Sequence, residues 1–261
     1  MLELPKTLEE AIAQAQQATL AAIADGQTRI QVEMVFPEIA LQAQSIALQF
    51  LPVFDNLPNF QKSEDSEAKT HPQVKVFFPD AGAAALARRD WGKEIPYKLE
   101  DIGLGKLPIQ SKIAAEDDVF LLVDPSSVEV GEVEKICQAV GDRPVVLLNP
   151  HLEDAGTVGI GYAARQLRQR LLSTLFSCYY VRPLEGAAIF RCYPSLWQVW
   201  LENQGEYQLL MELPKKPVGE EIDRILMTAT QPTNGNSGDA PKPKKPGIFA
   251  SMQRFLRALN N

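Results

Sequence analysis

Acidic and amide side chains follow four short apolar runs of the sequence, at the points where those runs end. The runs close as VFPE, FFPD, LVDPSS and LLNPH, which places polar groups at Glu38, Asp80, Asp124, Asn149 and His151. If the runs are parallel strands, their carboxyl ends meet at one edge of a sheet, where open α/β proteins bind ligands. Oxygen ligands gathered there could hold magnesium or orient a ribose or phosphate. One hypothesis is therefore a nucleotide- or phosphate-ligand-binding enzyme, with Glu38, Asp80, Asp124 and Asn149 as its candidate residues.

The same residue types also begin helices, and this second interpretation is favoured. Asp and Ser at a strand-to-helix junction accept hydrogen bonds from the first free N–H groups of the helix. Ser126 and Glu129 form an S-x-x-E pattern directly after the run FLLVD, which is typical of a capping box. The polar residues at the strand ends are thus expected to cap helices more often than to catalyse.

Complete catalytic motifs are missing from the rest of the chain. Gly159-x-Gly161-x-x-Ala164 has the spacing of a dinucleotide-binding loop, but it lies several residues beyond LLNP and no acid follows at a second strand end. A serine triad would need His151, and no G-x-S-x-G sequence is present. The three cysteines form no C-x-x-C pair, so buried thiols are expected. The sequence predicts neither a cofactor nor a metal site, and a non-enzymatic role is favoured.

The elements that must position these residues follow from the hydrophobic pattern, which predicts one α/β domain over residues 1–230. Apolar runs alternate with helix-like segments up to Phe176, as in parallel sheets covered on both faces. Four strand-like runs joined by tight turns then follow, with a last helix from about Gly219 to Thr228. A three-layer, Rossmann-like, mostly parallel sheet continued by an antiparallel C-terminal meander is expected. Residues 55–72 are predicted to form a polar loop.

Residues 231–261 differ in composition from the domain. Residues 231–247 are rich in Pro, Gly, Asn and Lys and predict a flexible linker, whereas residues 248–261 repeat apolar residues at spacings of three and four, as in an amphipathic helix. This basic tail is the candidate membrane- or partner-binding segment. Its residues are Lys242, Lys244, Lys245, Ile248, Phe249, Met252, Arg254, Phe255, Leu256, Arg257 and Leu259.

Charge divides the chain in the same place. The whole chain has 26 basic and 33 acidic residues, of which residues 231–261 hold five and one, so the tail carries +4 and the domain −11. An acidic domain repels nucleic acid and anionic lipid, and attraction to an anionic surface is therefore confined to the tail. No apolar run reaches the roughly 20 residues of a membrane span. We expect a cytoplasmic protein without nucleic-acid partners.

Much of the chain resembles a domain-of-unknown-function family of cyanobacteria and plastids. The resemblance covers nearly all of residues 7–230 and is carried by the segments RIQVEMVFPE, VKVFFPDAGAAALARRDWG, FLLVDPSSVEVGEVEKICQAVGDRPVVLLNPHLED, YAARQLRQRLLSTLFSCYYVRPLEGAAIFRCYPSLWQVWLE and YQLLMELPKKP. In plants the family resembles the low-photosystem-II-accumulation assembly factors, and a similar domain follows the kinase domain of a chloroplast adenylate kinase. The resemblance transfers no catalytic residues.

The resemblance implies a soluble or thylakoid-associated auxiliary factor for photosystem II assembly. The basic tail is expected to hold it peripherally on the cytoplasmic face of the thylakoid membrane. Its expected partners are photosystem II assembly intermediates or other thylakoid proteins, together with an anionic membrane surface reached by the tail. This function and the enzyme hypothesis differ in what they require of the strand ends. The enzyme needs Glu38, Asp80, Asp124 and Asn149 around one pocket, whereas the assembly factor does not.

Overall fold

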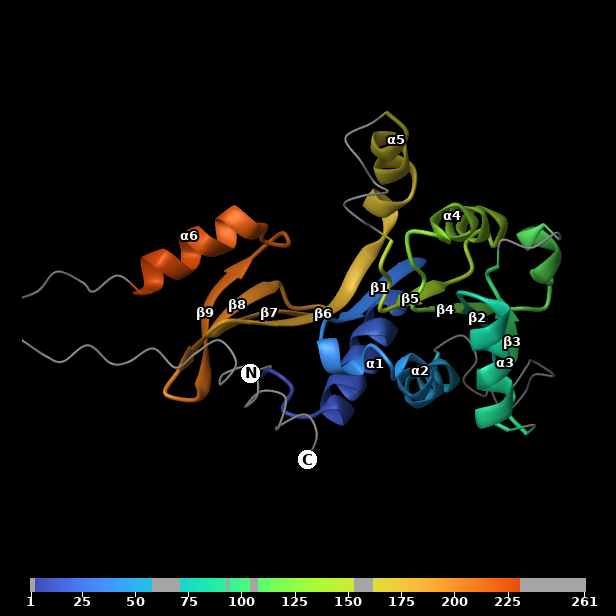
Figure 1. Cartoon of the computed structure of the whole chain (residues 1–261), viewed down its shortest axis with the longest axis horizontal. Helices are drawn as coiled ribbons and strands as arrows, with labels where there is room; N and C mark the ends of the chain where they lie inside the picture. Colours follow the sequence, from blue (N-terminus) through green and yellow to red (C-terminus); the bar gives the residue numbers. More distant parts are fainter. Residues whose placement is uncertain (1–2, 58–70, 93, 104–107, 153–161, 231–261) are drawn as a thin grey trace, which may run out of the picture.

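The protein is built on a single nine-stranded sheet in the order β3-β2-β4-β5-β1-β6-β7-β8-β9 (Figure 1). The computed structural model describes residues 3–57, 71–92, 94–103, 108–152 and 162–230. The first six strands of this order are parallel to one another, and β6 to β9 form an antiparallel meander. The strands are β1 (Arg29–Met34), β2 (Val74–Phe78), β3 (Lys98–Asp101), β4 (Val119–Val123), β5 (Val145–Leu148), β6 (Phe176–Leu184), β7 (Ala187–Cys192), β8 (Trp197–Asn203) and β9 (Glu206–Leu213).

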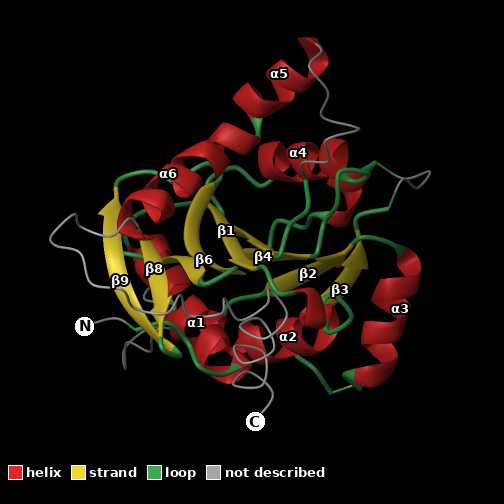
Figure 2. Cartoon of the chain, turned by 60° about the vertical axis from the view of Figure 1, so that its left-hand side comes forward, coloured by secondary structure: helices red, strands yellow, loops and turns green. Residues whose placement is uncertain are grey.

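Helices cover the parallel part of the sheet on both faces (Figures 1 and 2). Three of them lie on one face, here the α1 face, and α4 and α5 lie on the other, here the α4 face. The helix α6 follows the meander. The helices are α1 (Leu8–Ala24), α2 (Ala43–Phe50), α3 (Ala81–Asp90), α4 (Val130–Ala139), α5 (Tyr162–Arg170) and α6 (Gly219–Thr230).

Small apolar residues let α1 lie close to the sheet. The helix begins where Thr7 Oγ1 accepts a hydrogen bond from Glu10 N at 3.1 Å, as its capping sequence predicts. Four alanines, Ala11, Ala15, Ala18 and Ala22, recur on one side of the helix and are completely buried. Because alanine loses no side-chain entropy and is the best helix former, this stripe favours both the helix and its close packing. The α1 face carries the larger hydrophobic core.

The central parallel strands are buried along their whole length. VKVFF in β2, VFLLV in β4 and VVLL in β5 have no exposed position, as expected for strands with helices on both faces. Lys75 of β2 is buried despite its charge, because its Nζ lies 2.8 Å from a carboxylate oxygen of Asp117. A buried ion pair of this kind is stable only when its remaining polar atoms are also bonded.

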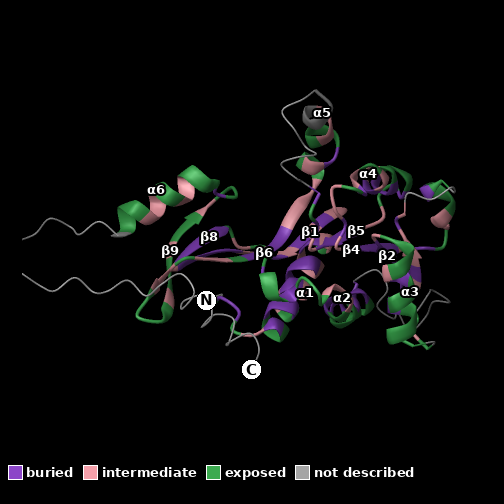
Figure 3. Cartoon of the chain, in the orientation of Figure 1, coloured by how far each residue is buried: buried purple, intermediate pink, exposed green. Residues whose placement is uncertain are grey.

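The meander is less completely covered than the parallel strands. Figure 3 shows intermediate and exposed residues along β9 and α6, and Leu209 and Met211 of β9 are among the exposed apolar side chains. Trp197 and Trp200 of β8 are both buried, in different hydrophobic clusters. The sheet therefore ends in an edge strand whose faces are half open to solvent.

The predicted architecture is confirmed, with one strand missed. The parallel sheet, its helices, the antiparallel continuation and the last helix are all present. The missed element is β3, whose sequence KLED is polar because it forms the outer edge of the sheet. Several predicted features lie outside the described residues, namely the linker 231–247, the tail 248–261, Gly159, Gly161 and most of the 55–72 loop. Among the helices that the structure describes, none is long and apolar enough to cross a membrane.

Candidate functional site

The topology opens a crevice at the carboxyl ends of β1, β4 and β5. After β1 the chain passes to α2 on the α1 face, whereas after the neighbouring β5 it passes to α5 on the α4 face (Figure 1). Adjacent parallel strands whose connections leave in opposite directions separate at their ends, and ligands of open α/β sheets bind there. We call this hollow the strand-end crevice. It encloses about 340 Å³ and is bordered by Met34, Phe36, Asp124, Asn149 and His151.

Two residues turn sharply into this crevice from neighbouring strands. Asp124 follows β4 with φ 52° and Asn149 follows β5 with φ 49°. Asp and Asn tolerate this left-handed region better than other residues that carry a Cβ. Each is followed by proline, which has no N–H to donate to the ladder, so both strands stop at the same level. The two D/N-P sequences thus place Asp124 and Asn149 side by side.

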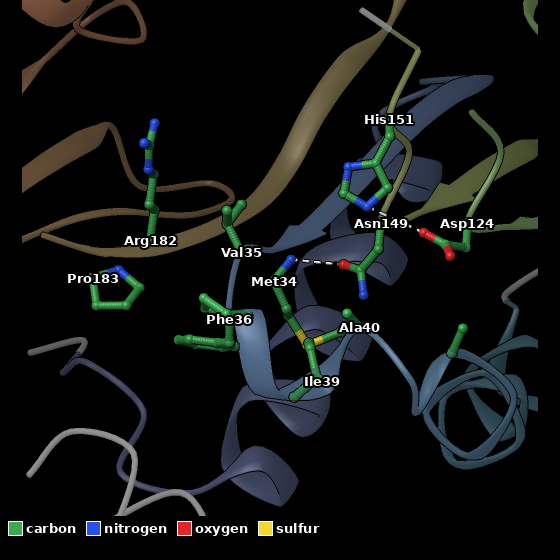
Figure 4. A pocket seen from close by; sticks show the side chains of 12 residues that line it. Met34, Val35, Phe36, Ile39, Ala40, Asp124, Asn149, His151, Arg182 and Pro183 are labelled. Carbon is green, nitrogen blue, oxygen red and sulfur yellow. Dashed lines mark hydrogen bonds and ion pairs between the residues drawn. The ribbon is translucent and has the colours of Figure 1, made fainter. Parts of the chain in front are cut away.

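The amide of Asn149 holds the fold at this point. Its Oδ1 accepts a hydrogen bond from the backbone N–H of Met34 at 2.7 Å, so it fixes the end of β1 against β5 (Figure 4). The backbone N–H of Asn149 also donates to Val32 O at 2.8 Å. The residue therefore satisfies backbone groups that the diverging strands would otherwise leave unpaired.

Asp124 pairs with the histidine that was a catalytic candidate. The Nε2 of His151 lies 3.2 Å from Asp124 Oδ1, with the imidazole side chain 70% exposed and the carboxylate 35% exposed. The backbone supports the pair, because His151 N–H donates to Pro125 O at 2.7 Å. Burial raises the pKa of Asp124, and the nearby His151 opposes that rise. An aspartate that orients an exposed imidazole is an arrangement that acid–base catalysts also use.

The other two predicted residues lie away from the crevice. Asp80 caps α3, since its Oδ1 accepts a hydrogen bond from Ala83 N at 2.9 Å. Glu38 is exposed in the short 3-10 helix after β1 and does not line the crevice. Asp80 ends the strand next to β4, but its carboxylate is bonded to the first turn of α3 and does not line the crevice. The structure thus brings Asp124, Asn149 and His151 together, without Glu38 or Asp80.

Ser126 also forms hydrogen bonds that stabilise its own turn. Its backbone N–H and its hydroxyl both donate to Glu129 Oε2, at 2.9 and 2.6 Å, and its Oγ accepts from Val128 N. The S-x-x-E sequence therefore closes on itself in the turn before α4, which begins at Val130. Within the described part of the chain, no group of three or more His, Cys, Asp or Glu side chains could hold a metal ion.

A second hollow lies on the α4 face of β1, and the sequence did not reveal it. It encloses about 470 Å³, and its polar residues are Gln31, Glu33, Ser177 and Lys216, with His151 at the border with the crevice. We call it the β1 cavity. Alternation of polar and apolar residues along RIQVEM was the available signal, since Gln31 and Glu33 must face away from the α1 core.

The domain carrying both hollows matches a known family. A family model described as a domain of unknown function, DUF1995, matches residues 5–224. The chain belongs to this family. No solved structure matches the chain. The matched region of this DUF1995 protein takes in the nine strands of the sheet, the strand-end crevice and the β1 cavity, and it stops before residues 231–261.

Proposed function

We propose that this protein is an auxiliary factor in photosystem II assembly that acts by binding proteins and the thylakoid surface rather than by catalysis. Support comes from its membership of DUF1995, together with the resemblance of that family to the low-photosystem-II-accumulation assembly factors. In this proposal the protein is peripheral on the cytoplasmic face of the thylakoid membrane. Its partners are assembly intermediates or other thylakoid proteins.

One observation carries the non-catalytic part of the proposal, namely that the polar strand-end residues are engaged in holding the fold. Asp80 caps α3, Asn149 fixes the end of β1, and Ser126 is bonded to Glu129. Groups committed to backbone N–H donors lose the freedom that a catalytic oxygen needs to contact substrate. The crevice walls are largely apolar, with Met34, Phe36 and Ile39 among them. Such walls suit docking of an apolar segment of a partner.

The basic tail supplies the membrane-binding part of the proposal. Its five lysines and arginines contrast with a domain charge of −11, and each such residue near an anionic surface contributes about 1 kcal/mol. Apolar side chains at helical spacing would add burial at the interface. The acidic domain opposes binding to nucleic acid. Attachment through the tail is therefore expected to be reversible and sensitive to salt.

The test combines liposome binding with complementation. The full chain, a version ending at Thr230, and a version with Lys242, Lys244 and Lys245 replaced by Gln are co-sedimented with liposomes of thylakoid anionic content at low and high salt. Only the full chain is expected to bind strongly, and salt should release it. In a cyanobacterium that carries this gene, deletion should lower photosystem II content on native gels, and the full chain should restore it. Normal photosystem II content in the deletion strain would refute the proposal.

The strand-end crevice favours a second candidate, a nucleotide- or phosphate-ligand-binding enzyme. The specific observation is the 3.2 Å pair of His151 and Asp124 beside a hollow at the strand ends, and the adenylate kinase that carries a similar domain agrees with it. The deletion strain also separates the two candidates. A folded His151→Ala protein that fails to restore photosystem II, beside a tail-less protein that succeeds, would favour the enzyme. The opposite pattern supports the assembly factor.

A further inference from the structure

Polar side chains lie on the α4 face of the sheet around β1. On β1, Ile30 and Val32 enter the α1 core, so Gln31 and Glu33 project from the other face. Ser177 of β6 is the register partner of Gln31. Neighbouring strands therefore present an amide, a carboxylate and a hydroxyl to one side.

These polar groups form the floor of the β1 cavity. Its walls are apolar and come from other parts of the chain, namely Leu152, Leu172, Leu175 and Trp197. With about 470 Å³ it falls in the size range of small-molecule sites, which typically combine apolar walls with a few placed polar groups. The β1 cavity has both features, and its residues Gln31, Glu33, Ser177 and Lys216 were not among the sequence-based candidates.

Three buried polar atoms at this face have no hydrogen-bond partner within the described part of the chain. They are Glu33 Oε2, Ser177 Oγ and Arg191 Nε, on the adjacent strands β1, β6 and β7. Native proteins leave few buried polar atoms unpaired, and each exception calls for a physical reason such as an absent ligand. Two of the three, Glu33 Oε2 and Ser177 Oγ, belong to residues that line the β1 cavity, which points to one common cause for them.

The charges around the cavity favour an anion. The guanidinium carbon of Arg191 lies 5.4 Å from the centre of the Phe176 ring and 5.3 Å from that of Trp197. Among the residues that the structure describes it has no carboxylate partner. Lys216 Nζ lies 3.6 Å from Glu33 Oε1 and 3.8 Å from the centre of the Tyr180 ring. Lys216 thus lines the cavity and Arg191 lies beside its Trp197 wall, so two cations are near one carboxylate in an otherwise acidic domain.

We propose that the β1 cavity binds a small organic anion built on a flat ring that carries an N–H donor. The ring lies against Trp197, the N–H donates to Glu33 Oε2, and the acidic group is held by Lys216, with the charge of Arg191 beside the Trp197 wall. Aromatic rings stack on tryptophan, and charged hydrogen bonds fix orientation. Nucleotides and N-acylated tryptophan share this chemistry. The proposal concerns a different hollow from the strand-end crevice and does not depend on a role in photosystem assembly.

The test measures thermal unfolding of the full chain with GMP, AMP or N-acetyl-L-tryptophan, and with inorganic phosphate as a probe of charge alone. A ligand that binds only the folded state raises Tm with its concentration. One ring-bearing anion is expected to give a saturable rise. The nucleotides carry a phosphate and the tryptophan derivative carries a carboxylate. The compound that raises Tm therefore identifies the acidic group of the ligand.

Matched variants locate the binding. Lys216→Met should weaken the affinity about tenfold, the usual effect of losing one charged hydrogen bond. Lys215→Met removes the same charge from the neighbouring exposed residue and should leave the affinity unchanged. Ser177→Ala should weaken binding and leave Tm of the free protein equal or higher, because it removes an unpaired hydroxyl. These results together would assign the ligand to the β1 cavity.

Three outcomes would overturn the proposal. The first is that no ring-bearing anion raises Tm. The second is that phosphate alone reproduces the whole effect, which would mean that the ring is not recognised. The third is that Lys216→Met and Lys215→Met weaken binding equally, which would place the anion on the general surface charge.

Discussion

Two mostly buried carboxylates of this protein lie in opposite surroundings. Asp117, beside the outer parallel strands, is completely buried and accepts hydrogen bonds from Lys75 Nζ at 2.8 Å, Lys98 Nζ at 3.1 Å and Ala114 N at 2.8 Å. Glu33, in the β1 cavity, has one oxygen near Lys216 at 3.6 Å and one with no partner in the described part of the chain. Asp117 is thus a saturated carboxylate, in which both oxygens accept hydrogen bonds, whereas Glu33 is unsaturated because its Oε2 accepts none in the described part of the chain.

The pKa values of the two groups shift in opposite directions. Burial opposes ionisation of Asp117, but the hydrogen bonds from Lys75, Ala114 and Lys98 outweigh it and lower its pKa. Burial also opposes ionisation of Glu33, and there Lys216 does not compensate, so its pKa is raised. A carboxylate with every oxygen bonded stabilises the fold, whereas a half-bonded one is retained at a cost in stability. The comparison therefore separates a structural site from a candidate binding site.

The largest effect is expected at the saturated carboxylate. Asp117→Asn leaves buried Lys75 without its counter-charge, and breaking a buried pair in this way costs about 3–5 kcal/mol of unfolding free energy. Urea denaturation measures the loss. The control is Glu116→Gln, whose side chain is 58% exposed and also contacts Lys98, and it should change stability by less than about 1 kcal/mol. Equal effects of the two changes would show that burial of the pair contributes nothing.

An intermediate effect is expected at Asp80, which has a single backbone partner. Asp80→Ala removes the N-cap of α3 and should lower the free energy of unfolding by about 0.5–2 kcal/mol. Glu38→Ala is the matched control, because Glu38 is exposed and surface changes of this kind usually stay within about 0.5 kcal/mol. Urea denaturation measures the free energy of unfolding of both variants. An undiminished stability of Asp80→Ala would contradict the capping role and reopen a role in ligand binding.

The architecture could be predicted because buried strands and helices leave regular apolar patterns along the sequence. Continuous apolar runs such as VFLLV and VVLL identify doubly covered strands without knowledge of their neighbours. The edge strand β3 was missed because KLED lacks that pattern, and its order in the sheet depends on pairing with β2. Elements with local signals could be predicted, and elements defined by a partner could not.

The candidate sites show the same division. Asp124 and Asn149 could be predicted as neighbours because both end parallel strands, but Asp80 was grouped with them although its carboxylate caps α3. The β1 cavity needs β1, β6 and the segment after β9 together, with Glu33 and Lys216 far apart in the sequence. No local motif marks such a site, since each residue is ordinary in its own segment.

Glu33 gives the smallest predicted change in the free energy of unfolding. This change best separates the two kinds of carboxylate, because replacing Glu33 is expected to stabilise the protein, whereas replacing Asp117 or Asp80 destabilises it. The pKa of Glu33 in the folded state lies above its ordinary value of 4.5, so the folded protein holds the proton more tightly than the unfolded chain does. Its contribution to stability is therefore fully present below pH 4.5 and is lost as the pH rises through the folded pKa. A glutamine at this position does not titrate. The Glu33→Gln variant should therefore become more stable than the wild type only as the pH rises from 4.5 through the folded pKa of Glu33.

Glu33→Gln is accordingly expected to be neutral at pH 4 and to raise the free energy of unfolding by up to about 1 kcal/mol at pH 7, the scale of one hydrogen-bonding group. Urea denaturation at both pH values measures the difference. Glu206→Gln, at an exposed acid of β9, is the matched control for removing one acidic group and should change the free energy of unfolding by less than about 0.5 kcal/mol. A destabilised Glu33→Gln at pH 7 would mean that Lys216 satisfies the carboxylate as fully as Lys75 and Lys98 satisfy Asp117. The contrast between a structural and a binding carboxylate would then fail.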